Sequence, residues 1–448
     1  MLVRTYFFNF CKTSRSYSSF ERCSRFKKVI LMVLMMEKNW LNDVLRNLCT
    51  NRADILGEES TYLEFETDES YENKSSADGL NSNQLYGKII YKDERGNVCK
   101  SEPVVVKRAL NTFRAKLTLS FSFINELNFY TKIMPTFNTL DATFSTLFPK
   151  FYHGEMIFNA EGDQSTLIFE NLKSKGYTMS EKKSFLSYQH LNLMMRKLGQ
   201  FHAYSYKAKK SMPNLFYPLA RNFLESCREL NKESFDMLAF GVQRGLDHLQ
   251  LDPTYVEYIP QLQKILENAA DVLASILTGD RNNPFSVIVH GDYLSHNVMF
   301  KYENDVPNDA IMIDMATFRY GSPVIDLAKV LYVNADQDTR DKHWDSLVNE
   351  YYTALKETFV ENEIPSKNEI LSEFIDKSIF AYVLASFFLQ LLITNDNGIL
   401  IRNASEYHSE NETTESVIEE VLHNGGEPAT RALSNILKDM IDRKFICR

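Results

Sequence analysis

Two stretches of sequence decide the fold: Val289–Asn297, which reads VHGDYLSHN, and Ile311–Asp314, which reads IMID. Together they give the pattern H-x-D-x-x-x-x-N, followed by an apolar run that ends in a lone aspartate. Phosphoryl transfer uses an aspartate that receives or orients a hydroxyl proton, then an asparagine and a second aspartate that bind magnesium. The predicted catalytic residues are His290 and Asp292, and the predicted metal ligands are Asn297 and Asp314.

The spacing of these residues has a physical reason. Val287–Val289 is a short β-branched run, which predicts a buried strand that ends at the catalytic loop. The polar segment Lys301–Asp309 predicts a turn, and Ile311–Ile313 predicts a strand that returns. A hairpin of this kind would place Asp314 beside Asn297.

The sequence HGD by itself is weak evidence, because glycine and aspartate are common in turns. The combination of two apolar runs, HxD, an asparagine and a second aspartate is far more restrictive. A hydrolase finds little support: the chain has no G-x-S-x-G, and His290 and Asp292 are too close in sequence to indicate a triad.

The composition indicates a folded chain with more than one lobe. Its 448 residues are 44% hydrophobic and 12% aromatic, which is enough for a sizeable core. The net charge of −9 argues against a nucleic-acid partner. Six cysteines are scattered without a CxxC pair, which favours a reducing compartment, the cytoplasm. No apolar run is long enough for a membrane span, and Ile379–Ile393 is expected to be a buried helix.

Residues 1–36 differ in character from the rest of the chain. They carry seven basic residues against a single acid, Glu21, and they are rich in Phe and Ser. This bias resembles a mitochondrial transit segment. A mobile arm and a start-site artefact are the alternatives.

The next region predicts a small lobe built on a strand pair. Leu85–Tyr91 and Val104–Lys107 are apolar runs separated by a polar turn. Lys107 follows three valines, as in the V-A-I-K pattern that aims an ammonium at nucleotide phosphates. Phe113–Met134 has helical periodicity, and its Glu126 is the expected ion-pair partner of Lys107. A solvated lysine and a solvated glutamate are the alternatives.

Two further segments are expected to meet a nucleotide. Asp78–Asn83 lacks a GxGxxG pattern, but its backbone amides could cradle phosphate, with Gly79 and Asn81 as the binding residues. Thr166–Leu172 predicts a strand that runs into the connection between lobes, where the backbone around Glu170 would meet adenine.

The remainder is predicted to be a helical lobe. Lys182–Lys209 and Phe223–Leu277 have helical patterns, and residues 405–428 are expected to form an exposed loop with a short helix. His202 is expected to be a packed or capping histidine. Asp326 is expected to brace the catalytic loop, to stabilise the start of a helix, or both.

In these residues the chain resembles the ecdysteroid-kinase-like, or choline/aminoglycoside-kinase-like, proteins abundant in insects. The resemblance covers most of residues 37 to about 395. The segments that carry it are Val104–Lys107, Asn125–Tyr130, Leu167–Leu172, Leu198–Ala203, Val289–Phe300 and Ile313–Leu327. It implies an α+β, bilobal protein-kinase-like fold. We expect a small, mainly β N-lobe over 37–171 and a large helical C-lobe over 172–448.

The resemblance also implies ATP- and magnesium-dependent phosphorylation of a hydroxyl on an apolar small-molecule alcohol, an ecdysteroid-like steroid or a xenobiotic. A protein acceptor is disfavoured, because Asp326 follows Asp314 within 12 residues and leaves little room for an activation loop. A non-catalytic pseudokinase or small-ligand binding protein is the alternative. Leu294, Met315 and Ala316 depart from the family pattern. Residues at these places influence which acceptor is bound and how Asp314 is positioned.

Overall fold

The computed structural model places the chain in two units, residues 1–69 with 87–104 and residues 70–86 with 105–448. It describes residues 41–48, 50, 60–68, 82–109, 115–156, 158–159, 162–163, 165–227, 239, 241–278, 283–359, 364–375, 377–393 and 423–447. Several predictions lie outside these residues: those for 1–36, for Gly79 and Asn81, and for nearly all of 405–428.

The first unit contains three antiparallel strands. β1 (Thr61–Thr67) pairs with β2 (Ser82–Lys92), which pairs in turn with β3 (Val98–Lys100). A turn joins β2 to β3, and the Asp93 carboxylate accepts hydrogen bonds from backbone N–H groups inside it. The predicted strand and turn are therefore confirmed. The strand that follows the turn is β3, however, and Val104–Lys107 comes later in the chain.

The second unit carries β4 (Val104–Ala109) from its second residue on, together with β8 (Thr166–Glu170) and β5 (Phe151–Glu155), in the strand order β4-β8-β5. All five residues of β8 are buried, which explains the apolar run Leu167–Phe169 at its centre. After β4 the chain forms helix α4 (Ala115–Asn128), which continues through a π-helical turn, η2 (Phe129–Ile133). Two shorter helices and a two-stranded ribbon complete this region: α5 (Met134–Asn138), η3 (Ala142–Leu147), β6 (Phe158–Asn159) and β7 (Gly162–Asp163).

The rest of the second unit is mainly helical, as predicted. Its longer helices are α6 (Tyr188–Ser211), α7 (Pro213–Cys227), α9 (Gln243–Leu249), α10 (Ile259–Leu266), α11 (Ala269–Thr278), α12 (Val324–Lys329), α13 (Gln337–Thr358), α14 (Lys367–Ser372), α15 (Ile379–Ile393) and α18 (Gly426–Asp442). Helix α15 has the bounds that its apolar run predicts. Helix α6 begins later than predicted, because Ser187 has an extended backbone and precedes the first helical residue.

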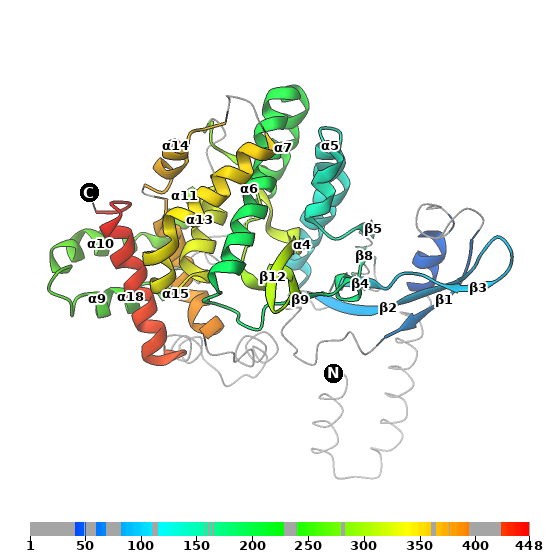
Figure 1. Ribbon diagram of the computed structural model, residues 1–448, viewed down its shortest axis with the longest axis horizontal. Coiled ribbons are helices and arrows are strands. Elements are labelled where there is room, and N and C mark those ends of the chain that lie inside the picture. Colours follow the sequence, from blue (N-terminus) through cyan, green and yellow to red (C-terminus); the bar gives the residue numbers. More distant parts are fainter. Residues whose placement is uncertain are drawn as a thin grey trace, which may run out of the picture. The chain divides into compact units, whose positions relative to one another are not determined.

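Helix α6 runs through the centre of the helical core. Met194, Leu198 and Phe201 are fully buried, and α6 packs along α13 (Figure 1). The two helices approach closely at Gly199, where a side chain would overlap the backbone carbonyl of Tyr351. Side chains on the buried face of α6 are therefore held in fixed positions, and so are the residues that they contact.

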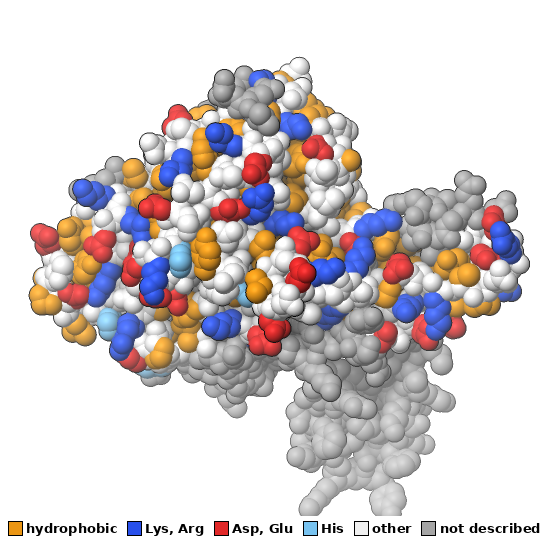
Figure 2. Space-filling model, viewed as in Figure 1, with side chains coloured by type: hydrophobic (Ala, Val, Ile, Leu, Met, Phe, Trp, Pro, Cys, Tyr) orange, Lys and Arg blue, Asp and Glu red, His pale blue; other side chains and the backbone are white. Residues whose placement is uncertain are grey.

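No helix within the described ranges is long and apolar enough to cross a membrane. On the face shown in Figure 2, acidic and basic side chains are interspersed over the coloured surface.

Candidate active site

Two small antiparallel sheets hold the candidate site. β10 (Val287–Val289) is fully buried, leads into the loop that contains the HxD motif, and pairs with β13 (Arg319–Gly321). β11 (Val298–Glu303) lies between β12 (Val306–Met312) and β9 (Tyr177–Met179). The predicted strand before the loop and the predicted returning strand are confirmed.

The turn between β11 and β12 is shorter than predicted. The polar segment Lys301–Asp309 is mostly strand, and only Asn304 and Asp305 form the turn. Both residues have a left-handed backbone, with φ of 50° and 61°. A two-residue hairpin turn requires this geometry, and asparagine and aspartate tolerate it better than most residues.

The hairpin places Asp314 beside Asn297, as predicted. Val298 lies opposite Met312, and the N–H of Ile313 donates to the carbonyl of Asn297 at 3.0 Å. Asp314 itself has a left-handed backbone with φ of 62°. Such a conformation is uncommon for a non-glycine residue and persists only where the surrounding structure holds it.

Asp292 and Asn297 contact each other within the loop. The Asn297 Nδ2 donates to the backbone carbonyl of Asp292 at 2.8 Å and to its Oδ2 at 2.9 Å. These bonds fix the amide with its Oδ1 turned away from Asp292.

Asn297 and Asp314 fit a magnesium ion. The two side chains offer an amide oxygen and a carboxylate, and the Asp314 side chain is 42% exposed. Magnesium takes oxygen ligands and is commonly held by one or two protein groups together with substrate phosphates. In the part of the chain that the structure describes, no three His, Cys, Asp or Glu side chains gather into a metal cluster.

The predicted pair of Lys107 and Glu126 forms. The Lys107 Nζ lies 2.7 Å from Glu126 Oε2 and 3.1 Å from Asp314 Oδ1. Burial raises the pKa of Glu126 to about 7, and Lys107 opposes this rise. The Asn125 Nδ2 donates to the carbonyls of Ala316 and Phe318, both at 2.9 Å. Helix α4 is thus tied to the segment that follows Asp314.

His290 has a different position from that expected of a catalytic group. Its ring is fully buried, Nε2 contacts the carbonyl of Ile313 at 2.9 Å, and Nδ1 contacts the N–H of Asp292 at 3.3 Å. Burial lowers the pKa of His290, against the opposing effect of Asp326 and Asp292. A neutral ring with both nitrogens engaged positions the loop and has no free nitrogen for a substrate.

Asp326 braces the catalytic loop. Its carboxylate accepts from the N–H of His290 at 2.7 Å and of Gly291 at 2.9 Å. His202 lies 3.2 Å away on the same carboxylate and contacts the Tyr351 hydroxyl at 3.0 Å. His202 is therefore a packed histidine, as predicted, and it connects helix α6 to the loop. The bracing role and the helix position of Asp326 hold together, since Asp326 lies in the first turn of α12.

Two residues of the site were not predicted from the sequence, Lys329 and His296. Lys329 lies 3.2 Å from Asp292 Oδ1, and His296 lies 3.3 Å from Asp292 Oδ2. Burial opposes ionisation of Asp292, but the Lys329 and His296 contacts outweigh it and hold its pKa well below the usual value. Each residue had a signal: Lys329 is the one basic residue of a short helix that is otherwise apolar apart from Asp326, and His296 follows Asp292 at four residues.

The side chain of Glu170 serves the local structure. It is buried, accepts from the Lys150 N–H at 2.8 Å and pairs with Lys175. Asn171 then begins the turn η4 (Leu172–Lys175) by accepting from the Lys173 N–H at 3.0 Å. A contact between this backbone and a nucleotide stays a prediction.

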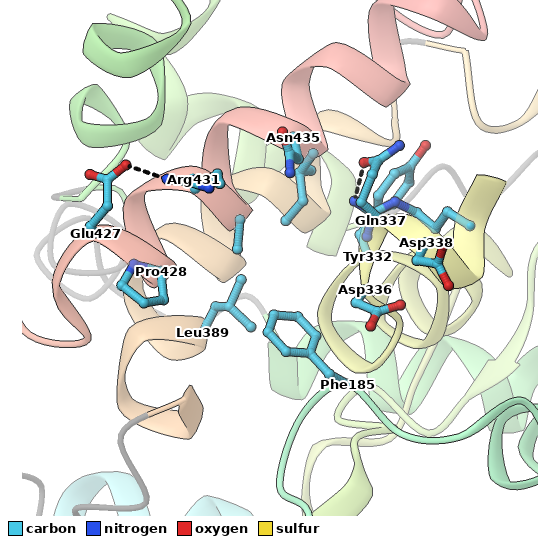
Figure 3. Close-up of a pocket in the computed structure, with 13 residues that line it drawn as sticks. Phe185, Tyr332, Asp336, Gln337, Asp338, Leu389, Glu427, Pro428, Arg431 and Asn435 are labelled. Atoms are coloured by element: carbon cyan, nitrogen blue, oxygen red, sulfur yellow. Dashed lines mark hydrogen bonds and ion pairs between the residues drawn. The ribbon is translucent and has the colours of Figure 1, made fainter.

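A pocket of about 460 Å³ lies among α13, α15 and α18 (Figure 3). Its lining combines apolar side chains such as Leu389 with charged ones, including an Arg431–Glu427 pair at 3.3 Å. None of the predicted site residues is among the described residues that line it. Asn334 lies between two lining residues in sequence, and its Oδ1 accepts from the N–H of Ser295 in the catalytic loop at 3.2 Å.

Comparison with known proteins assigns a family. The sequence pattern of the ecdysteroid kinase-like family matches residues 84–362. The chain belongs to the ecdysteroid kinase-like family. The predicted α+β, protein-kinase-like fold, with a small mainly β lobe and a large helical lobe, is thereby confirmed. Membership supports a kinase-type enzyme that acts on a small molecule.

Solved structures of phosphotransferases are also similar to this member of the ecdysteroid kinase-like family. Spectinomycin phosphotransferase with AMP bound is 12% identical, with 85% of this chain and 97% of that chain covered, at a TM-score of 0.36. An aminoglycoside phosphotransferase with ADP bound is 13% identical, with 86% and 96% covered, at 0.30. An aminoglycoside 2'-phosphotransferase with GDP bound is 12% identical, with 85% and 98% covered, at 0.33. No curated protein matches the chain significantly in sequence.

Proposed function

We propose that this protein is an ATP- and magnesium-dependent kinase that phosphorylates a hydroxyl of an apolar small-molecule alcohol, with ecdysteroid-like steroids as the leading acceptor class. One observation carries the proposal. Asp292, Asn297 and Asp314 form one connected site with the Lys107–Glu126 pair, although Lys107 and Asp314 are 207 residues apart in sequence.

The division of work among these residues follows from their contacts. Lys107, held by Glu126 at 2.7 Å, supplies a fixed ammonium for the nucleotide phosphates. Asn297 and Asp314 would hold the magnesium, which when bound would supply positive charge to neutralise the phosphates. Asp292 would accept a hydrogen bond from the acceptor hydroxyl and orient its oxygen towards the γ-phosphorus.

The reaction balances without a further reagent. The hydroxyl oxygen forms a bond to the γ-phosphorus, and the bond from that phosphorus to the β–γ bridging oxygen breaks. ADP leaves, and the hydroxyl proton passes by way of Asp292 to solvent. Because the low pKa of Asp292 makes its carboxylate a weak base, its main contribution is orientation.

The test is a transfer screen of the full chain with magnesium and γ-labelled ATP against steroid alcohols, choline and xenobiotic alcohols. The expected result is a labelled product with an apolar alcohol, and a loss of about 10²–10⁴-fold in rate for Asp292→Asn. Transfer that is unaffected in Asp292→Asn would contradict the assignment.

A thermal-shift measurement separates the alternative of a ligand carrier. The same alcohols are added with and without magnesium-ATP. Stabilisation by an alcohol that is independent of nucleotide, together with an absence of transfer, would support a carrier and reject the kinase.

A further inference from the structure

We propose that Lys329 is a positioning residue of the active site, which holds the Asp292 carboxylate in the orientation that the acceptor hydroxyl requires. The proposal deepens the proposed function and rests on it. Its starting point is the place of this lysine: the side chain is only 7% exposed, and it is the one basic residue of the buried helix α12. A buried ammonium is costly unless it is paired and hydrogen-bonded.

The partners of Lys329 belong to the catalytic loop. Its Nζ donates to the backbone carbonyl of Gly291 and lies 3.2 Å from Asp292 Oδ1. The centroid of the Phe380 ring, on α15, lies 5.9 Å from the same nitrogen. An aromatic ring is thus a further neighbour of the ammonium. The ammonium of Lys329 therefore contacts two consecutive residues of the catalytic loop, Gly291 and Asp292.

Helix α12 contacts the catalytic loop through two side chains that lie one helical turn apart. Asp326 accepts from the N–H of Gly291, and Lys329 donates to its carbonyl. Residues three apart on a helix lie on the same face, so one face of α12 supplies both an acceptor and a donor. The backbone of Gly291 is thereby held from both ends, which sets the position from which the Asp292 side chain projects.

The Asp292 carboxylate is then fixed through both of its oxygens. Oδ1 contacts Lys329 at 3.2 Å, and Oδ2 accepts from Asn297 at 2.9 Å. A carboxylate held at both oxygens cannot rotate freely. A fixed carboxylate is what Asp292 needs in order to orient the acceptor hydroxyl.

The charges of the site support the same assignment. Asp314 has Lys107 at 3.1 Å, and Asp292 has Lys329 at 3.2 Å, so each aspartate has a lysine of its own. Without Lys329, the Asp292 carboxylate would face the phosphates of a bound nucleotide without a lysine beside it. Repulsion would then turn it away from the position next to the γ-phosphorus.

The variant that tests this is Lys329→Met, which keeps the length of the side chain and removes the ammonium. Lys329→Arg retains the charge. The matched control is Lys209→Met, because Lys209 is a partly buried lysine whose Nζ donates to the carbonyls of Pro284, at 2.9 Å, and Ser286. Those carbonyls lie just before β10, whereas the contacts of Lys329 lie beyond its end.

Turnover is measured as magnesium-dependent ATP hydrolysis and as transfer to the best acceptor of the screen. We expect Lys329→Met to lower kcat by about 10- to 100-fold, with KM for ATP nearly unchanged, because a displaced catalytic group affects the reaction more than nucleotide binding. Lys329→Arg should restore part of kcat. Lys209→Met should lower thermal stability and leave kcat unchanged.

Hydrogen exchange of the peptide that spans residues 290–297 gives a readout that does not require activity. We expect faster exchange in Lys329→Met than in the wild type, and no such change in Lys209→Met. Unchanged exchange in Lys329→Met, or equal acceleration in both variants, overturns the proposal. If the wild type neither transfers phosphate nor hydrolyses ATP, the proposed function fails, and the exchange result alone decides the role of Lys329.

Discussion

Asp314 joins a left-handed backbone to a half-exposed carboxylate in contact with Lys107. Strained backbone of this kind clusters at functional sites, where surrounding contacts hold it. The contacts here are the hydrogen bond from Ile313 to Asn297 and the bonds from Asn125 to the following segment. The side chain itself contributes little to the core, so its removal separates chemistry from stability.

Asp314→Ala should abolish magnesium-dependent turnover while the chain remains folded, because a proposed metal ligand is lost. The measurement is phosphate transfer together with the thermal unfolding curve. Asp305→Gly is the control, since it lies in the same hairpin, keeps a left-handed backbone and touches no site residue. Full turnover in Asp314→Ala would reject its assignment as a metal ligand.

His290 predicts how stability depends on pH. Its pKa in the folded chain is lowered from the ordinary value of 6.5 by burial. Below pH 6.5 the unfolded chain therefore binds a proton that the folded chain does not, and the free energy of unfolding falls as the pH falls.

His290→Gln removes this proton and should make the acid side of the stability curve shallower by up to about 1.4 kcal/mol per pH unit. Denaturant unfolding across the pH series measures the slope. The difference should vanish above roughly pH 7.5, where histidine is neutral in both states. Parallel curves on the acid side would show that His290 accepts a proton in the folded chain.

At the scale of elements, α12 and the π-helical turn after it, η8 (Val330–Asn334), hold the catalytic loop along its length. Asp326 binds its start, and the Oδ1 of Asn334 accepts from Ser295 near its end. π-Helical turns are rare and frequently occur at functional sites. Helix α12 and η8 form one continuous helical segment that presents both residues to the loop.

Asp326→Asn tests this arrangement. The carboxylate accepts from two backbone N–H groups and contacts His202, all inside the protein. Loss of its charge should lower the free energy of unfolding by about 1.5–3 kcal/mol and lower kcat as well, because the loop loses its brace. Chemical denaturation and transfer assays measure the two effects. A variant with wild-type values for both would show that the brace is dispensable.

At the scale of the whole chain, sequence patterns predict those features that depend on residues close together in the sequence. The β-branched run before the HxD motif, the apolar run of α15 and the lysine after three valines each predict their structure, because burial requires such sequences. The ion pair of Lys107 with Glu126 was predictable because one motif implies the other. The role of Lys329 was not, since its partners are 37 and 38 residues away and no local pattern names them.

Trp344 is a side chain whose fluorescence can report on the unfolding of the helical core of the second unit. The chain has two tryptophans, and Trp344 is buried, with the Arg443 guanidinium 4.0 Å from its ring centroid and the Phe374 and Phe445 rings beside it. α13, the segment after α14 and the segment after α18 therefore meet at this residue.

In a Trp40→Phe background, the fluorescence of Trp344 should shift to the red in one denaturant transition that coincides with the loss of helical circular dichroism. The physical reason is that its neighbours come from distant parts of a continuous core, so the ring stays buried only while those parts are packed together. Two separate transitions would show instead that the core divides.

Gly291 gives the structure a genetic consequence. Its backbone is left-handed with φ of 83°, and any side chain there would overlap the carbonyl of Thr317. Every missense codon at this position should therefore behave as a loss-of-function allele, whatever the new residue's polarity. An immunoblot of a strain with such an allele, beside an activity assay, measures whether the loss lies in the site or in the amount of folded chain.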